Sequence, residues 1–388
     1  MITTSIGFLA CLLLIGSSLV FVETKTQAKF FSYVPSIVIL YFVIVLLASV
    51  GLWDQQAPAI EQTTAQVKSV ILPAMIFLML LGCDLRVVAK LGRKAFIAFF
   101  ITTVAIMLAF IIVYSILGRW LDPDAWKAFA ALNASWSGGT GNMVAVQQAV
   151  QAPSEQMGYA MLTDSVCYSI WFAFLFALIA KAPAFDRWVK AKHLDNTFEH
   201  LGDVARKKPI QRHDLFFLFA ISMGVSAIAL GVSHHLPTFG LLSDSVWMIL
   251  IATGLGLVGA MSPLNRLSGS ETLSMILLFL LVSLVASSAS ISHFSKAPLF
   301  VLSGLLILVI QASLVVFFAR IFRLNLALCS IASLANIGGI AGASILAAGY
   351  GRVFVPVGVL MALLGFVVGS QTGLIVGGIL SSIHTLIS

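Results

Sequence analysis

The sequence consists largely of apolar runs of about 20 residues separated by short polar connections, and few folds accept such a pattern. A helix needs about 20 apolar residues to cross about 30 Å of hydrocarbon. Hydrophobic residues make up 60% of the chain and charged residues 10%, whereas about a quarter of the residues of a soluble domain are charged. A membrane barrel would show only weak alternation. The pattern therefore predicts an all-α integral membrane protein.

Ten runs are predicted to cross the membrane, and two further runs contain glycine pairs. No basic residue precedes the first run, whereas Lys25 and Lys29 follow it, which is the charge order of an uncleaved helix with its N-terminus outside. The predicted crossings are 4–22, 34–51, 68–85, 95–118, 158–181, 214–233, 244–262, 271–291, 299–320 and 353–381, and the two further runs are 125–150 and 325–350.

The distribution of Lys and Arg indicates how these two further runs are arranged. If both crossed, the basic loop 86–94 and the hydrophilic stretch 182–213 would lie on opposite sides, against the positive-inside rule. If both are re-entrant hairpins, 18 of the 22 Lys and Arg lie inside and both termini outside. We therefore expect a multi-pass protein of the bacterial inner membrane with a cytoplasmic linker at 182–213. The net charge of +7 then reflects cytoplasmic loops, and no nucleic-acid partner is expected.

Each hairpin run has a glycine pair near its middle, Gly138-Gly139 and Gly338-Gly339, and the pairs are 200 residues apart. Half a run has about 12 residues, or about 18 Å of helix, which reaches just past the middle of the membrane. The repeated order of three helices, one helix, a hairpin and one helix predicts two inverted repeats, an architecture of alternating access. The predicted parts are residues 1–181 (core part 95–181), the linker 182–213, and residues 214–388 (core part 299–388).

The first hairpin concentrates polar side chains at its glycine turn. Glycine permits a sharp turn, and the half-helix that begins near Gly141 points its positive end at the tip. Such a turn would suit an anionic group or a desolvated cation, and the alternative is a packing face of small residues. The candidate binding residues are Asn133, Ser135, Ser137, Gly138, Gly139, Thr140, Gly141 and Asn142.

The second hairpin keeps the glycine pair but is less polar. Asn336 is its one strong ligand candidate, and the alternative for this residue is an ordinary interhelical hydrogen bond. The candidate residues of the second half are Asn336, Gly338, Gly339, Gly342 and, on the last helix, Gln371.

Asp164 is the one acidic residue well inside an apolar segment, and Thr163 adjoins it. A carboxylate at that depth costs several kcal/mol unless it is paired, protonated or bound to a cation, which favours binding of a coupling ion, Na⁺ or H⁺. The alternative is an Asp at a wet interface, bonded to Ser or Thr. The position 200 residues later holds Leu364, so an ion site would be asymmetric. No Lys or Arg is expected inside an apolar segment.

Other chemistry finds little support. The four cysteines show no CxxC spacing, and His234 and His235 have no third ligand nearby, so neither a disulfide nor a metal site is expected. The chain has no nucleotide-binding loop and no Gly-x-Ser-x-Gly elbow, which disfavours an ATP-driven pump or an intramembrane hydrolase and predicts no organic cofactor. Asp84 beside Arg86 at a helix end is expected to form a solvated ion pair.

The turn Gly138-Gly139-Thr140-Gly141 resembles the GGxG turn of re-entrant loops in the sodium/glutamate symporters and the 2-hydroxycarboxylate transporters. The second hairpin departs from this motif, because Gly342 comes one residue late. As a whole the sequence also resembles the YjcL-like family of multi-pass membrane proteins. The resemblance to the transporters implies a homodimer with an elevator movement, in which 95–118, 158–181, 299–320, 353–381 and both hairpins form the mobile core.

Three functions remain as alternatives. The hairpin tips and Asp164 favour a sodium- or proton-coupled symporter of a small organic solute, an anion in the first instance. A cation/proton antiporter would use the buried Asp without an organic substrate. For a non-transporting membrane scaffold, substitution of Asp164 would cause no phenotype. The identity of the substrate stays open at this point.

Overall fold

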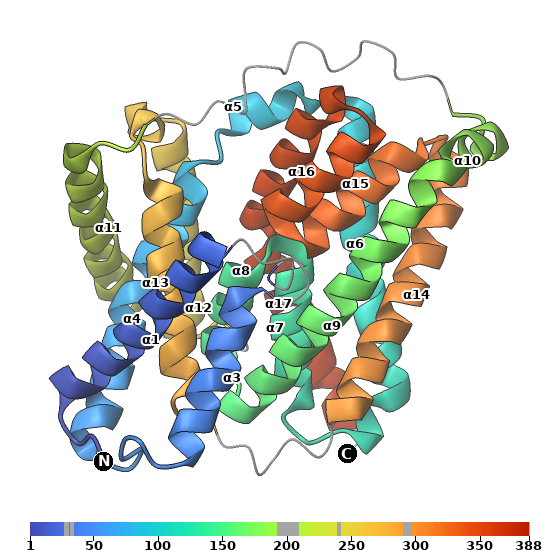
Figure 1. The fold of residues 1–388 in the computed structure, drawn as a ribbon. Coiled ribbons are helices and arrows are strands. Elements are labelled where there is room, and N and C mark those ends of the chain that lie inside the picture. Colours follow the sequence, from blue (N-terminus) through green and yellow to red (C-terminus); the bar gives the residue numbers. More distant parts are fainter. Residues whose placement is uncertain (27–30, 32–34, 192–208, 239–241, 290–296, 388) are drawn as a thin grey trace.

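A computed structural model of the chain describes residues 1–26, 31, 35–191, 209–238, 242–289 and 297–387, and these residues are almost entirely helical (Figure 1). Within these ranges there is no strand, and one isolated bridge pairs Ile2 with Trp53. The all-α prediction is confirmed for this part of the chain.

Seven helical spans among the described residues are long and apolar enough to cross a membrane. Three of them are extended by short helices: α6 continues to Trp120, α9 continues into α10 (Ala182–Val189), and a short helix at Arg352–Phe354 precedes α17. The helices are α1 (Ser5–Thr26), α4 (Pro58–Leu81), α6 (Arg93–Leu117), α9 (Ser154–Leu178), α11 (Arg212–Ser233), α14 (Ala297–Phe322) and α17 (Val355–Ile387). The chain is thus a multi-pass membrane protein by the length and composition of its helices.

The other three predicted crossings are shorter apolar helices in the structure. They are α3 (Ser36–Ser49), α12 (Asp244–Ala260) and α13 (Ser270–Ala286), and residues 32–34 and 290–296 beside two of them lie outside the described part. Most of the predicted linker, 192–208, also lies outside it, and the linker's first residues form α10.

The α4 helix differs from its prediction, which began at residue 68. It begins at Pro58, a residue suited to the first turn of a helix because no amide donor is needed there. The polar residues before position 68 look like a loop in the sequence, but they form the first turns of α4 and several of them line a cavity. Lys68 therefore lies about 15 Å along an apolar helix, and the expectation of no Lys or Arg inside an apolar segment is wrong.

The helices pack as two groups. In one group α4 lies against α11, α12 and α13, while α1 and α3 pack on α13. In the other group α14 lies against α6 and α9, and α17 packs against α6 and both hairpins. The contacts between the groups run mainly through α8, which touches α4, α12 and α13, and through α9, which touches α3 and α13.

Both glycine-containing runs form helical hairpins. The first consists of α7 (Ala125–Gly138) and α8 (Thr140–Ala149), and the second of α15 (Leu326–Ile337) and α16 (Gly339–Tyr350). Gln156, just after the first hairpin, donates a hydrogen bond of 3.3 Å to Asp122, just before it. In the second hairpin the Tyr350 hydroxyl donates to Ser330 Oγ at 3.2 Å. Each hairpin therefore starts and ends on one side of the bundle.

The two hairpins enter the bundle from opposite ends. The chain approaches the first hairpin past Tyr114, whose hydroxyl lies 3.3 Å from His384 Nδ1 near the C-terminus. The second hairpin begins beside α10, where Asp186 Oδ1 accepts a hydrogen bond of 2.8 Å from the Leu326 amide. Figure 1 shows both chain ends on one side of the bundle and α5 (Leu85–Val88) and α10 on the other.

Candidate functional site

The first hairpin turns at Gly138 and Gly139 with almost no free space. Gly139 has a φ of 83°, a conformation that favours glycine. A Cβ on Gly138 would collide with the carbonyl oxygen of Gly365 and lie 2.9 Å from Cα of Gly369, both on α17. The tip of the first hairpin is therefore pressed onto the backbone of α17.

Gly365 lies between the two hairpin tips. A Cβ on this residue would lie 3.0 Å from the carbonyl oxygen of Ser137 and 3.6 Å from that of Ala335, one on each hairpin. Glycines continue from here at every fourth position of α17, a spacing that lets membrane helices approach closely, and α7 packs along them. These glycines are Gly365, Gly369, Gly373 and Gly377. The tips of the two hairpins thus meet at the middle of α17.

Asp164 on α9 is bound to the first hairpin. Trp136 Nε1 donates a hydrogen bond of 2.8 Å to Asp164 Oδ1, and Ser135 Oγ donates to the same oxygen at 3.4 Å. Trp136 and Ser135 are buried, whereas Asp164 keeps part of its surface accessible. The carboxylate therefore has one oxygen held by the hairpin and room for a further partner. Its second oxygen, Oδ2, accepts no hydrogen bond found within the described residues.

Tyr168 lies one helical turn after Asp164 and contacts the second hairpin instead. A Cβ on Gly338 would lie 2.6 Å from the Tyr168 ring, and one on Gly342 would lie 3.0 Å from its hydroxyl oxygen. Two consecutive turns of α9 therefore contact the two hairpins, the first through Asp164 and the second through Tyr168.

The hairpin asparagines hold helices together. Asn142 Nδ2 donates to the carbonyl oxygens of Gly138, at 2.7 Å, and Phe366, at 3.3 Å, while Asn142 Oδ1 accepts from Ser370 Oγ. Asn336 Oδ1 accepts from Thr103 Oγ1 at 2.9 Å. For Asn336 the structure thus shows the interhelical hydrogen bond that the sequence analysis gave as the alternative.

Several buried polar atoms of the predicted site have no hydrogen-bond partner among the described residues. Asn133 is fully buried, yet neither its amide nitrogen nor its oxygen is bonded, and Ser137 follows it on the same face of α7. A buried polar group without a partner costs about 1–3 kcal/mol, so such atoms call for a ligand, an ion or water. The atoms are Asn133 Nδ2 and Oδ1, Ser137 Oγ, Thr163 Oγ1 and Gln371 Oε1.

The remaining predicted residues are spread around the tips. Gly141 packs on α4, because a Cβ there would lie 2.7 Å from Met79 Sδ. Thr140 is half-buried at the start of α8, and Gly339 has a φ of 60° with open space around it. The sequence analysis missed Trp136, Tyr168 and Gly365. The two aromatic residues lie in apolar runs, where the sequence does not distinguish a site residue from ordinary core packing. The four-residue glycine spacing of α17, in contrast, was visible in the sequence.

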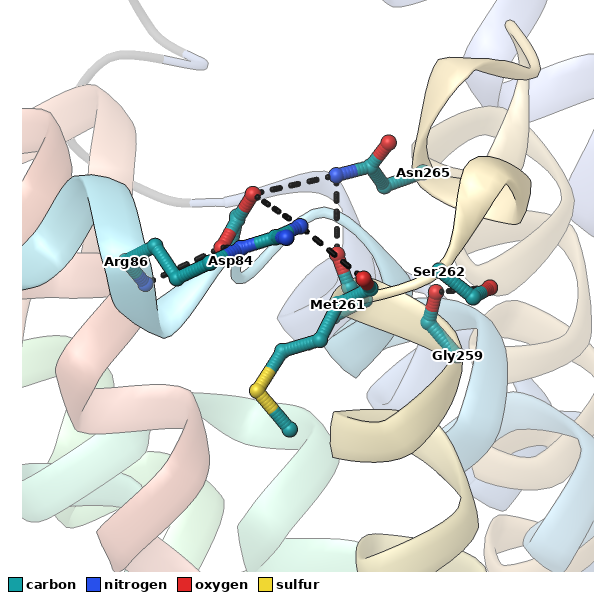
Figure 2. Close-up of polar contacts among 7 residues, drawn as sticks. Asp84, Arg86, Gly259, Met261, Ser262 and Asn265 are labelled. Atoms are coloured by element: carbon teal, nitrogen blue, oxygen red, sulfur yellow. Dashed lines mark hydrogen bonds and ion pairs between the residues drawn. The ribbon is translucent and has the colours of Figure 1, made fainter.

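A polar cluster connects the segment after α4 with the segment after α12 at the end of the bundle away from the chain termini (Figure 2). Arg86 donates to both carboxylate oxygens of Asp84, at 3.0 and 3.1 Å, and to the carbonyl oxygen of Met261 at 2.9 Å. Asn265 Nδ2 donates to Asp84 Oδ2 at 3.2 Å. The hydrogen bonds and charge of Arg86 hold the pKa of Asp84 below its ordinary value. The predicted ion pair is confirmed.

The arrangement around Asp164 provides oxygen ligands in a low-dielectric setting. A hard cation prefers oxygen ligands, and a lone carboxylate surrounded by protein is stabilised by either a bound cation or a proton. The unbonded oxygens of Ser137 and Thr163 lie on the two helices, α7 and α9, that Asp164 joins. Asp164, held between the first hairpin and α9, is therefore the candidate site for one small cation or one proton.

Comparison with known proteins places the chain in a family. The chain is 24% identical, over 375 residues, to the protein named "Uncharacterized membrane protein YjcL" of Bacillus subtilis (strain 168), with 92% of this chain and 93% of that protein covered. The expected resemblance to YjcL-like proteins is thereby confirmed. Residues 7–383 match one family along almost the whole sequence, and the chain belongs to that family, described as "Protein of unknown function (DUF819)".

Proposed function

We propose that the chain is an ion-coupled secondary transporter that moves a small organic solute across the bacterial inner membrane by alternating access. One observation carries the proposal: two helical hairpins from opposite ends of the bundle meet at Gly365, and Asp164 is bound to one of them. Interrupted helical elements at membrane depth are tolerated where they line a site, and in transporters they surround the substrate.

Asp164 is the proposed site of the coupling ion, Na⁺ or H⁺. Its accessible carboxylate oxygen and the unbonded oxygens of Asn133, Ser137 and Thr163 supply the ligands for a cation. A bound cation would also satisfy buried oxygen atoms that it contacts, which otherwise weaken the folded state.

The movement that we propose carries the hairpins together with α6, α9, α14 and α17 past the other helices, in a homodimer. Two observations support it. These elements pack mainly among themselves, and the first hairpin meets α4 through a small residue, Gly141 against Met79. An interface with few large interlocking side chains favours sliding of packed helices.

A cation/proton antiporter is the second candidate. It is favoured by the internal hydrogen bonds of Asn142 and Asn336, because these engage the side-chain amides at both tips and leave Asp164 as the charged group of the site. An antiporter needs no organic ligand, so such a site would suffice.

Transport by the purified chain in liposomes tests both candidates. An inward Na⁺ or H⁺ gradient should drive accumulation of a radiolabelled solute from a metabolite panel, and the Asp164→Asn variant should abolish it. If the chain is an antiporter, dilution of sodium-loaded liposomes changes the lumenal pH with no solute added. If neither response exceeds that of empty liposomes for any solute or gradient, the transport proposal is wrong.

A further inference from the structure

A cavity of about 600 Å³ lies among the helices of the first group, α4, α11, α12 and α13, and touches the second group at Gln148 of α8. Its walls come from the first half of α4, the end of α11, the start of α12 and the residues after α13. The first hairpin contributes one residue, Gln148 of α8. Ligand pockets for small molecules commonly have volumes of about 300–1,000 Å³. The cavity is therefore large enough for a small solute, and it touches the first hairpin at Gln148, near the C-terminal end of α8.

Lys68 is the one basic residue of the described cavity wall, apart from His234 at its mouth. It is half-buried, and no carboxylate of the described residues lies within ion-pair distance of its Nζ. Side chains of a helix tilt toward its N-terminus, so the Lys68 stem leans toward the first turns of α4, which also line the cavity. A lysine inside an apolar helix is costly and marks a functional site unless another charge compensates it.

Gln148 supplies a second unsatisfied donor. Its Nε2 atom is buried and has no hydrogen-bond partner among the described residues, and the side chain lines the same cavity as Lys68. The hydroxyl group of Thr64 also lines it, whereas those of Ser69 and Ser287 donate to the carbonyl oxygens of Gln66 and Leu284. The ammonium group of Lys68, the amide N–H of Gln148 and the hydroxyl of Thr64 are the kinds of donor from which a carboxylate accepts hydrogen bonds.

The acidic residues of the cavity limit the ligand to one negative charge. Asp244 Oδ2 accepts from His234 Nδ1 at 2.9 Å and is thus engaged. Glu61 is exposed and lies two helical turns before Lys68, about 10 Å away along α4. A second carboxylate group on the ligand would meet Glu61 and no second lysine, so a dicarboxylate fits this wall poorly.

We propose that this cavity binds a small organic monocarboxylate, with Lys68 as its counter-ion and the Gln148 amide as a donor. The assignment names the substrate class of the proposed transporter, and its functional meaning rests on that proposal. Because Gln148 belongs to the first hairpin and Lys68 to α4, a bound carboxylate would connect the two groups of helices. Among the ligand classes left open by the sequence, the structure thus favours an anion held by a protein cation.

Binding of lactate and acetate to the whole chain in phosphatidylcholine nanodiscs tests the site. Phosphatidylcholine carries no carboxylate, and N-methylglucamine salts without sodium or any gradient separate binding from transport. Titration calorimetry should show saturable lactate binding that Lys68→Gln weakens at least tenfold and Lys68→Arg weakens less. Lys127→Met is the matched control, because Lys127 pairs with Asp124 outside the cavity, and it should bind lactate within twofold of the unsubstituted chain.

Chemical labelling gives a second measurement that needs no substitution. Lactate should slow acetylation of Lys68 by a water-soluble amine reagent at least threefold, relative to chloride at equal ionic strength, and leave Lys127 unaffected. Absence of lactate and acetate binding, or equal binding by Lys68→Gln, overturns the assignment. Lactate binding through Lys68 in a chain that shows no gradient-driven uptake supports this site while it refutes the proposed transport. If the chain transports a solute and Lys68→Gln binds lactate as the unsubstituted chain does, the transport proposal is supported and this site is refuted.

Discussion

Trp136 Nε1 donates a hydrogen bond of 2.8 Å to Oδ1 of Asp164, and this bond ties the first hairpin to α9. A hydrogen bond to a charged group stabilises by about 1.5–3 kcal/mol when its partner is present. Since Tyr168, one turn further along α9, packs on the glycines of the second hairpin, α9 contacts both tips. A change in the charge of Asp164 would thereby act directly on the first hairpin.

The first prediction concerns Asp164→Asn. Asn keeps the volume and accepts the Trp136 hydrogen bond, but it removes the charge that a cation needs. Gradient-driven uptake or exchange should fall at least tenfold in liposomes, while the thermal unfolding midpoint of the purified chain stays within a few degrees. Asp84→Asn is the matched control for loss of one acidic side chain, since Asp84 lies outside the site. Normal uptake by Asp164→Asn across the pH range would assign Asp164 a structural role.

The second prediction uses the glycine spacing of α17. Gly369→Ala would place a Cβ 2.7 Å from Asn142 Nδ2 and 2.8 Å from Gly138 Cα, so the first hairpin must shift. Overpacking of this kind costs about 1–3 kcal/mol. Gly224 of α11 has open space around its Cβ position, and Gly224→Ala should be neutral or stabilise by up to about 1 kcal/mol, because alanine favours helix. Thermal unfolding followed by tryptophan fluorescence distinguishes the two variants, and equal midpoints would contradict the close packing of the tip.

The hairpins and the polar turn of the first could be predicted because glycine pairs and the distribution of Lys and Arg are properties of the sequence itself. The role of Trp136 could not, because an indole in an apolar run looks like core until α7 and α9 are packed together. Lys68 was misplaced for a different reason. The polar first turns of α4 lower the local hydropathy, yet they belong to the helix and line a cavity, so a hydropathy pattern begins the segment too late.

The third prediction concerns Asp84 and Arg86. The folded pKa of Asp84 is lowered by Arg86, so the interaction stabilises the fold above the unfolded pKa, about 3.9, and is lost as the pH falls through the lower folded value. Arg86→Ala should therefore lower the free energy of unfolding only slightly at pH 7, because the arginine is largely exposed and solvent screens its charge. The difference from the unsubstituted chain should stay constant from pH 8 to pH 5 and shrink in stronger acid. A difference that grows below pH 4 would show that the pair does not hold Asp84 ionised.

The last prediction concerns the opposite entry of the two hairpins, on which alternating access depends. Single cysteines replace exposed residues at both ends of each hairpin, in a chain whose four native cysteines are replaced by alanine. Pro123→Cys and Gln151→Cys flank the first hairpin, and Arg323→Cys and Arg352→Cys flank the second. Because Gln156 bonds to Asp122 and Tyr350 to Ser330, each pair should react from a single side.

By the distribution of Lys and Arg, an impermeant thiol reagent added to intact cells should label the first pair and spare the second, which reacts only after permeabilisation. Mass spectrometry of the purified chain gives the extent of labelling at each position. If Pro123→Cys and Gln151→Cys instead react from opposite sides, α7 and α8 cross the membrane as one broken helix. In that case α7 and α8 would cross the membrane beside α17, and two hairpin tips would not meet at Gly365. The antiporter would then become the better proposal.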